Sequence, residues 1–164
     1  MTQPLSAFTG AMIYLDTLSF YALVRKLHPA VRDLFTRIKD GKVQAYTSAL
    51  TFDELAHRVV SALAHERDVK LGRAYPTAQQ SPLLTEFYPQ ILPTLTLLRN
   101  FPNLTLLDVS AIDLMLMGEN MARCHLGPRE ALHLAAMQKS GCFDIVSHNV
   151  VFDSIPEVHR YTLD

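Results

Sequence analysis

Short apolar stretches alternate with helical patterns along this chain, and that alternation limits its fold more than any other sequence feature. The run Met12-Ile-Tyr-Leu ends at Asp16, and apolar residues at helical spacing follow from Phe20 to Leu27. Strands that alternate with helices are typical of an α/β sandwich with a mostly parallel central sheet. The other strand candidates are residues 43–47, 104–107, 143–147 and 159–161.

The helices between these strands are predicted from apolar spacing and from their start and stop signals. Pro29 opens one helix that Gly41 stops, and Ser110 is a candidate N-cap for another. Five of the nine prolines lie in 76–102, so helix is interrupted there and resumes near Pro89 to Asn100. The remaining predicted helices cover residues 50–71, 111–124 and 129–140, and 148–152 is expected to be a loop.

The size and composition predict one globular domain. The chain has 164 residues, of which 49% are hydrophobic and 19% are charged. Residues 1–11 precede the first strand–helix unit and are expected to be an N-terminal extension to a domain at 12–164. Two cysteines cannot form a disulfide framework, and no stretch has the length of a signal or membrane segment. We therefore expect a cytoplasmic protein that does not enter a membrane.

The charge distribution is uneven, although the formal net charge is only −1. A balanced total counts against a strongly basic nucleic-acid binder. Residues 25–73, however, hold ten of the fifteen Lys and Arg residues against six acids. This segment forms either a basic face or an ordinary solvated helix surface, and the second interpretation is favoured.

Three carboxylates stand where strands end or helices begin. Asp16 follows the first buried strand. The alternative to a site role for this residue is that its side chain caps the next helix. Glu54 closes the pattern Thr51-Phe-Asp-Glu, which is also a capping box. Glu130 lies in the first turn of its helix, where the helix dipole alone favours an acid. Each residue is weak evidence by itself, whereas their coincidence at one edge of the sheet predicts a site.

A cluster of these three acids needs cations. Two carboxylates about 4 Å apart repel by about 4 kcal/mol at an effective dielectric near ~20. Mg²⁺ is typically held by few carboxylates together with water and substrate phosphates, and Mn²⁺ accepts similar ligands. The expected cofactor is therefore Mg²⁺ or Mn²⁺.

Four segments in order make the chain resemble the PIN domain, and within it the VapC-like toxins. The family fold is a three-layer α/β/α sandwich around a parallel sheet, and its members are commonly metal-dependent ribonucleases. The resemblance covers Met12 to the C-terminus and is weakest over 70–103. The segments are Ile13 to Thr17, Thr47 to Leu55, Leu126 to Met137 and Ile145 to Asp153.

The resemblance implies roles for individual positions. It assigns Asp16, Glu54 and Glu130 to the catalytic, metal-binding acids, although the family usually has Asp at the third place. The fourth acid falls on Asn149, which offers a carbonyl oxygen but no charge, so a second metal should bind weakly. Asp153 corresponds to a commonly acidic position and is expected to compensate.

The predicted activity is hydrolysis of RNA phosphodiester bonds by one or two divalent ions. Thr17 and Ser147 are hydroxyls beside the site that can orient a ligand or a phosphate. The alternative, from another class, is a catalytically weakened PIN module that binds RNA or a protein partner. The pair Glu130 and Asn149 motivates this alternative.

Two other kinds of site are disfavoured by spacing. Cys124, His125, Cys142 and His148 match no standard zinc template, and no G-x-S-x-G nucleophile elbow is present. His133 is interpreted as a core histidine rather than a metal ligand.

A VapC-like toxin implies a homodimer and a small antitoxin whose C-terminal segment blocks the acidic pocket. Apolar helix residues are candidate interface positions, with core packing favoured for each. These residues are Phe35, Leu63 and Phe87.

Overall fold

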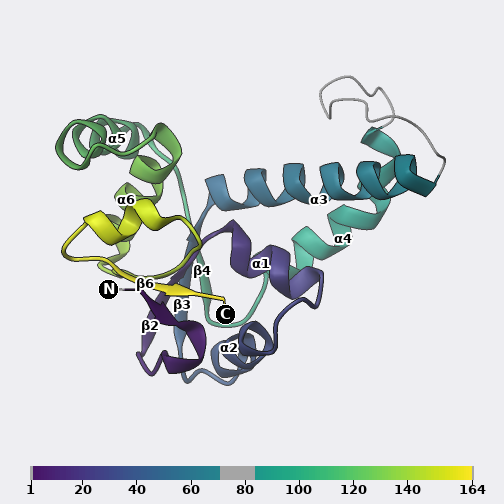
Figure 1. The fold of residues 1–164 in the computed structure, drawn as a ribbon, viewed down its shortest axis with the longest axis horizontal. Helices are drawn as coiled ribbons and strands as arrows, with labels where there is room; N and C mark the ends of the chain where they lie inside the picture. Colours follow the sequence, from purple (N-terminus) through teal and green to yellow (C-terminus); the bar gives the residue numbers. More distant parts are fainter. Residues whose placement is uncertain (1, 71–83, 164) are drawn as a thin grey trace.

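The fold is built on one sheet of six parallel strands. The computed structural model describes residues 2–70 and 84–163, and the strand order across the sheet is β1-β6-β5-β2-β3-β4 (Figure 1). Every strand pair is parallel, which confirms the predicted α/β class. The strands are β1 (Gln3–Pro4), β2 (Met12–Leu15), β3 (Gln44–Ser48), β4 (Leu104–Leu107), β5 (Asp144–Val146) and β6 (His159–Thr162).

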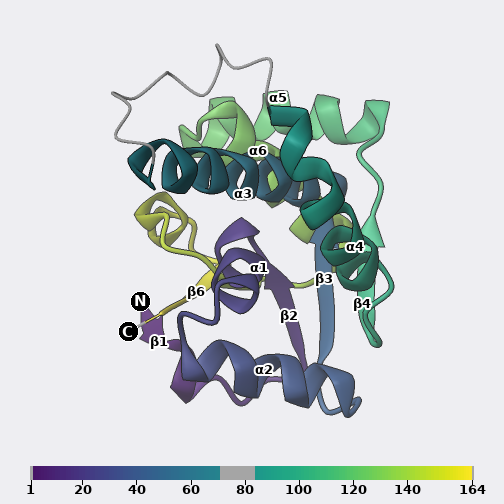
Figure 2. The same cartoon turned by 90° about the vertical axis from the view of Figure 1, so that its right-hand side faces the viewer.

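Helices cover both faces of this sheet, so the molecule has three layers. α5 and α6 lie on one side, and α1, α2 and α4 lie on the other (Figures 1 and 2). The helices are α1 (Thr17–Val24), α2 (Pro29–Lys39), α3 (Ala49–Lys70), α4 (Tyr88–Arg99), α5 (Ala111–Cys124) and α6 (Pro128–Ser140). Among them, within the described residues, none is both long and apolar enough to cross a membrane.

The alternation of side chains along β2 divides the core in two. Ile13 and Leu15 pack into a cluster with Phe20 and Phe35 on one face. Tyr14 points to the opposite face and joins a cluster with α6 residues such as Leu134. Because successive strand residues face opposite sides, a fully buried strand such as β2 needs helices on both faces.

The chain reverses its direction of travel across the sheet beside β2. From β2 it proceeds to β3 and β4 on one side, and β5 and β6 then return on the other side. Such a switch point, at the carboxyl ends of the strands, is where α/β sheets bind ligands. Asp16 follows β2 and Ser147 follows β5, and these strands are direct neighbours.

The first eleven residues contribute to the sheet and to the core. β1 pairs with the C-terminal strand β6, and the side chain of Phe8 is buried against the Tyr161 ring, with the ring centroids 5.1 Å apart. Between β1 and Phe8 the chain forms a short 3₁₀ helix, η1 (Leu5–Ala7), in which the side chain of Leu5 is buried. The segment expected to be an extension therefore supplies an edge strand.

Most predicted elements are confirmed within a few residues of their expected limits. Pro89 lies in the first turn of α4, and that helix continues past Pro93. The expected loop at 148–152 instead holds a 3₁₀ helix, η3 (Val150–Ser154), which Asn149 caps. The remaining short helix is η2 (Leu84–Phe87). The expected helix end at residue 71, Arg73 and the prolines Pro76 and Pro82 lie outside the described residues.

Candidate metal centre

Asp16 is held between two neighbouring strands and the helix that follows it. It is the N-cap of α1, and its Oδ1 accepts a hydrogen bond from the backbone N–H of Thr17. Its Oδ2 accepts from the hydroxyl of Ser147 at 2.6 Å. The capping interpretation is thus confirmed, and it is compatible with a site, because a carboxylate at a helix N-terminus can satisfy backbone donors and still face a ligand.

Glu54 points to the same place from the second turn of α3. The hydroxyl of Thr17 donates to its Oε2 at 2.6 Å, and its side chain is only 15% exposed. The capping-box interpretation of Thr51 and Glu54 is wrong, because α3 begins at Ala49 and the buried Thr51 hydroxyl has no hydrogen-bond partner. Glu54 is therefore free to serve the site instead of the helix start.

The surroundings of Glu54 keep it ionised. Burial opposes its charge, but interaction with His133, the hydrogen bond from Thr17 and the charge of Arg129 outweigh burial, so the pKa of Glu54 lies below its ordinary value. The guanidinium Nε of Arg129 lies 3.5 Å from Glu54 Oε1. A carboxylate whose pKa is lowered is present as an anion at neutral pH.

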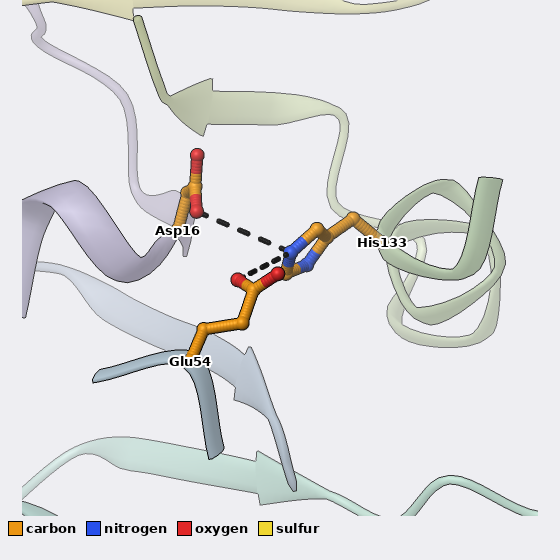
Figure 3. Close-up of side chains that lie close together, drawn as sticks. All are labelled: Asp16, Glu54 and His133. Atoms are coloured by element: carbon orange, nitrogen blue, oxygen red, sulfur yellow. Dashed lines mark ion pairs between the residues drawn. The ribbon is translucent and has the colours of Figure 1, made fainter. Parts of the chain in front are cut away.

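His133 completes the cluster from α6. Its ring is buried, with Nδ1 3.0 Å from the Tyr14 hydroxyl. Nε2 lies 3.5 Å from Glu54 Oε2 and 4.0 Å from Asp16 Oδ1 (Figure 3). One atom from each of the three residues lies within 4.8 Å of the others, and this is the group of metal-ligand type found in the described part of the chain.

The interpretation of His133 as a core residue describes its burial but not the direction of Nε2. A signal for this direction is present in the sequence. Glu130 and His133 are three residues apart, which places them on the same face of a helix. If Glu130 faces a site, His133 therefore faces the same site.

Glu130 and Asn149 form a second pair in the same cleft. The Asn149 Nδ2 amide donates to Glu130 Oε1 at 2.9 Å, and Asn149 Oδ1 accepts from the backbone N–H of Val151 at 3.2 Å. Both polar ends of the Asn149 side chain are thus engaged within the protein. In the described residues, Glu130 is not a member of the cluster formed by Asp16, Glu54 and His133.

The structure does not bring Asp153 to this pair. The Asp153 carboxylate forms an ion pair with Arg160 at 2.6 Å and accepts from the Thr2 hydroxyl at 2.9 and 3.0 Å. It is not among the residues that line the cleft. Its geometry therefore gives no support to a compensating role beside Asn149, because its oxygens hold the N-terminal segment to β6.

A cleft of about 780 Å³ contains the cluster and the second pair. Cationic and histidine side chains also line this cleft, beside the acidic ones. They come from α3, from the start of α6 and from the segment after β5, and they are His57, Arg58, Arg129 and His148. The arrangement of carboxylates surrounded by such side chains suits a ligand that carries both a cation and a phosphate.

The donor set fits a divalent cation. Asp16 and Glu54 supply oxygens from anionic groups, and His133 supplies a buried imidazole nitrogen. Hydroxyls of Thr17 and Ser147 hold the two carboxylates, as supporting groups around metal ligands commonly do. Of the predicted site residues, the structure thus brings Asp16, Glu54, Thr17 and Ser147 together around His133, with Glu130 and Asn149 in the same cleft.

Comparison with solved structures identifies the fold. The chain superposes on VapBC2 from Rickettsia felis bound to a promoter DNA fragment, with a TM-score of 0.63 and 15% identity, over 93% of this chain and 99% of the other. It is also similar to FitAB bound to an IR36 DNA fragment, with a TM-score of 0.55 and 16% identity over 92% and 94% of the two chains.

VapBC-1 from nontypeable Haemophilus influenzae gives a TM-score of 0.54 and 13% identity, over 92% of this chain and 97% of the other. No family model and no curated protein sequence matches the chain. The predicted resemblance to the PIN-like fold of VapC toxins is therefore confirmed by three-dimensional structure. At these identities the likeness concerns the fold alone.

Proposed function

We propose that the protein is a divalent-metal-dependent ribonuclease that hydrolyses RNA phosphodiester bonds. The observation that carries the proposal is the convergence of Asp16 and Glu54 at the switch point of the sheet, in a cleft whose other side chains include Arg58 and Arg129. The fold, which is shared with VapBC complexes, supports the same function.

Each side chain of the site has a role in this proposal. When bound, Mg²⁺ or Mn²⁺ supplies Lewis-acid activation for phosphodiester hydrolysis. Asp16 and Glu54 hold the ion, and Ser147 and Thr17 keep the two carboxylates in place through the hydrogen bonds described above. Glu130 lies beside them in the cleft and orients water or a second ion.

The basic side chains of the cleft position the substrate. Arg129 lies next to Glu54 but remains 71% exposed, so its guanidinium can contact a phosphate of the RNA strand. Arg58 stacks on the Tyr21 ring, with its guanidinium carbon 4.9 Å from the ring centroid. These contacts are sequence-independent, because phosphate contacts position a nucleic acid and base contacts specify it.

As biological context, we propose a toxin–antitoxin pair. Complexes of VapBC and FitAB are among those that share the fold, and two of the three named above were solved with DNA. By analogy, this chain is the toxin, acts as a homodimer in the cytoplasm and is inhibited by a small antitoxin. The free thiols of Cys124 and Cys142 suit a reducing compartment.

The test is cleavage of single-stranded RNA with Mn²⁺ by the wild type and by Asp16→Asn. Asparagine retains the shape and the helix cap but removes the charge, so we expect cleavage to fall by at least ~100-fold, since even supporting groups of a metal site cost 10–100-fold. Asp33→Asn is the matched control, because Asp33 is exposed on α2. Equal cleavage by wild type and Asp16→Asn contradicts the proposal.

The second candidate function is a catalytically weakened module that binds RNA or a protein partner. The two hydrogen bonds of the Asn149 side chain, to Glu130 and from the Val151 N–H, favour this second candidate. The Asn149 amide already has these partners and carries no charge with which to bind a second ion.

The substitution Asn149→Asp separates the two candidates. It places a second carboxylate beside Glu130, where the Asn149 amide now donates at 2.9 Å, so repulsion must be relieved by a cation. We expect tighter Mn²⁺ binding by calorimetry and faster cleavage. If neither changes, the missing charge does not limit the activity of this chain.

A further inference from the structure

The Nε2 atom of His133 is a buried nitrogen that faces two carboxylates. Its distances of 3.5 Å to Glu54 and 4.0 Å to Asp16 exceed the ~2.9–3.0 Å of a typical N–H···O hydrogen bond. A nitrogen at this separation from both oxygens is directed at the space between them. Figure 3 shows the ring edge pointing at both carboxylates.

This separation matches that of ligands on a shared ion. Metal–nitrogen and metal–oxygen bonds of ~2.0–2.2 Å place two ligand atoms of one ion about 3–4 Å apart. The measured distances, 3.5 Å and 4.0 Å, lie in this range before any adjustment of the side chains. The three residues come from different elements, so the packing of β2, α3 and α6 sets the spacing.

We propose that His133 Nε2 is a direct metal ligand together with Asp16 and Glu54, and that the site takes a first-row transition ion in preference to Mg²⁺. The inference rests on the proposed metal-dependent function and names the class of metal that serves it. Mg²⁺ requires oxygen ligands, whereas an imidazole nitrogen raises affinity for transition ions.

Tyr14 offers the acceptor that this role needs. A metal-bound histidine almost always donates its other ring N–H to a fixed acceptor, and the Tyr14 hydroxyl lies 3.0 Å from Nδ1. With the Tyr14 oxygen as acceptor for Nδ1–H, the unprotonated Nε2 faces Asp16 and Glu54 at 4.0 and 3.5 Å, as a metal ligand must.

The experiment is Mn²⁺ binding followed by electron spin-echo spectroscopy and by calorimetry. We expect ¹⁴N modulation from a coordinated imidazole in the wild type, and its loss in His133→Asn. By calorimetry, the preference for Mn²⁺ over Mg²⁺ is expected to fall at least ~10-fold in His133→Asn. Tyr14→Phe removes a supporting group and is expected to weaken Mn²⁺ binding by ~10–100-fold.

The control variant is His159→Asn, because His159 bonds Asp144 at 2.9 Å on another part of the sheet and does not line the cleft. It is expected to leave the modulation and the metal preference unchanged. Labelling the wild type with ¹⁵N-histidine shows that the modulation comes from a histidine, without any substitution. His57→Asn and His148→Asn, which alter the other two histidines that line the cleft, are expected to leave the modulation unchanged, so the test holds even if His133→Asn does not fold.

Two results separate this inference from the proposed function. If Mn²⁺ binds in an Asp16-dependent manner without nitrogen coupling, the ligand role of His133 is wrong and the nuclease proposal stands. If Mn²⁺ binds with nitrogen coupling but RNA is not cleaved, the ligand assignment stands and the nuclease proposal is wrong. Absence of Mn²⁺ binding overturns both.

Discussion

Single side chains decide how the carboxylates of the cleft are arranged. Thr17 and Ser147 each hold one acid through a hydroxyl at 2.6 Å, and Asn149 holds Glu130. These hydrogen bonds connect groups far apart in the sequence. A carboxylate held by charge-assisted hydrogen bonds loses little further freedom when it binds a ligand.

Gly127 makes room for the Glu130 carboxylate, so Gly127→Ala should disturb it. A Cβ at this position lies 2.5 Å from Glu130 Oε2, which forces the carboxylate to move and to leave the Asn149 amide. We expect a loss of about 0.5–1.5 kcal/mol in the free energy of unfolding, the usual contribution of one hydrogen bond. Urea denaturation measures it.

Gly118→Ala is the matched control for this prediction. A Cβ there meets no atom beyond the backbone of its own helix within 4 Å, and residue 118 lies inside α5. Alanine should therefore stabilise the protein by about 0.5–1 kcal/mol. If both alanine variants stabilise equally, Gly127 is not required for the position of Glu130.

At the scale of the elements, the buried carboxylate of Asp113 connects α5 to α6. Asp113 accepts from both the backbone N–H and the hydroxyl of Ser110, at 2.6 and 2.7 Å, which closes the capping box of α5. It also pairs with Lys139 of α6 at 3.2 Å. The predicted N-cap at Ser110 is thus confirmed, and the cap joins two helices.

Asp113→Asn should therefore lower the free energy of unfolding by an amount that depends on pH. Burial opposes the charge, but Ser110 and Lys139 outweigh it, and the pKa of Asp113 lies below its ordinary value of 3.8. A lowered pKa in the folded state stabilises at pH values above 3.8, and this stability is lost as the pH falls through the folded-state pKa. We expect the variant to lose about 1–2 kcal/mol at neutral pH.

Denaturation with guanidinium between pH ~7 and ~3 checks this prediction. The difference between wild type and Asp113→Asn should shrink toward the acidic end. Asp108→Asn serves as the control, because Asp108 is exposed and its substitution should change stability by less than about 0.5 kcal/mol. A difference that is constant with pH contradicts the electrostatic explanation.

At the scale of the whole molecule, the N-terminal segment is in contact with the C-terminal strand. β1 pairs with β6, and the 5%-exposed Arg160 bonds both Thr2 and Asp153 at 2.6 Å. Phe8 is buried against the Tyr161 ring of β6. We propose that the first eleven residues are part of the folding unit, although the sequence predicts them as an extension.

Phe8→Ala tests the contribution of these ends. Removal of a buried aromatic ring leaves a cavity, and we expect a loss of about 3–5 kcal/mol in the free energy of unfolding. Leu97→Ala is the control, because Leu97 is 73% exposed and its truncation should change stability by less than about 0.5 kcal/mol. Equal effects of the two variants mean that the N-terminal segment does not stabilise the core.

Periodicity and the order of four motifs were enough to predict the α/β class and the limits of most helices and strands within a few residues, although not β1 or η3. They also indicated the edge of the sheet beside which Asp16 and Glu54 lie. These features depend on local spacing and on the rule that parallel strands share one carboxyl edge. Neither requires knowledge of contacts between distant residues.

Tertiary packing alone decided which of the polar residues meet. Asp153 faces Arg160 and Asn149 faces Glu130, while His133 directs its nitrogen at Asp16 and Glu54. A helical or strand period fixes the face on which a side chain lies, but not its distance from a side chain on another element. That distance follows from how β2, α3 and α6 pack together, and it brings a ring nitrogen of His133 close to the two carboxylates.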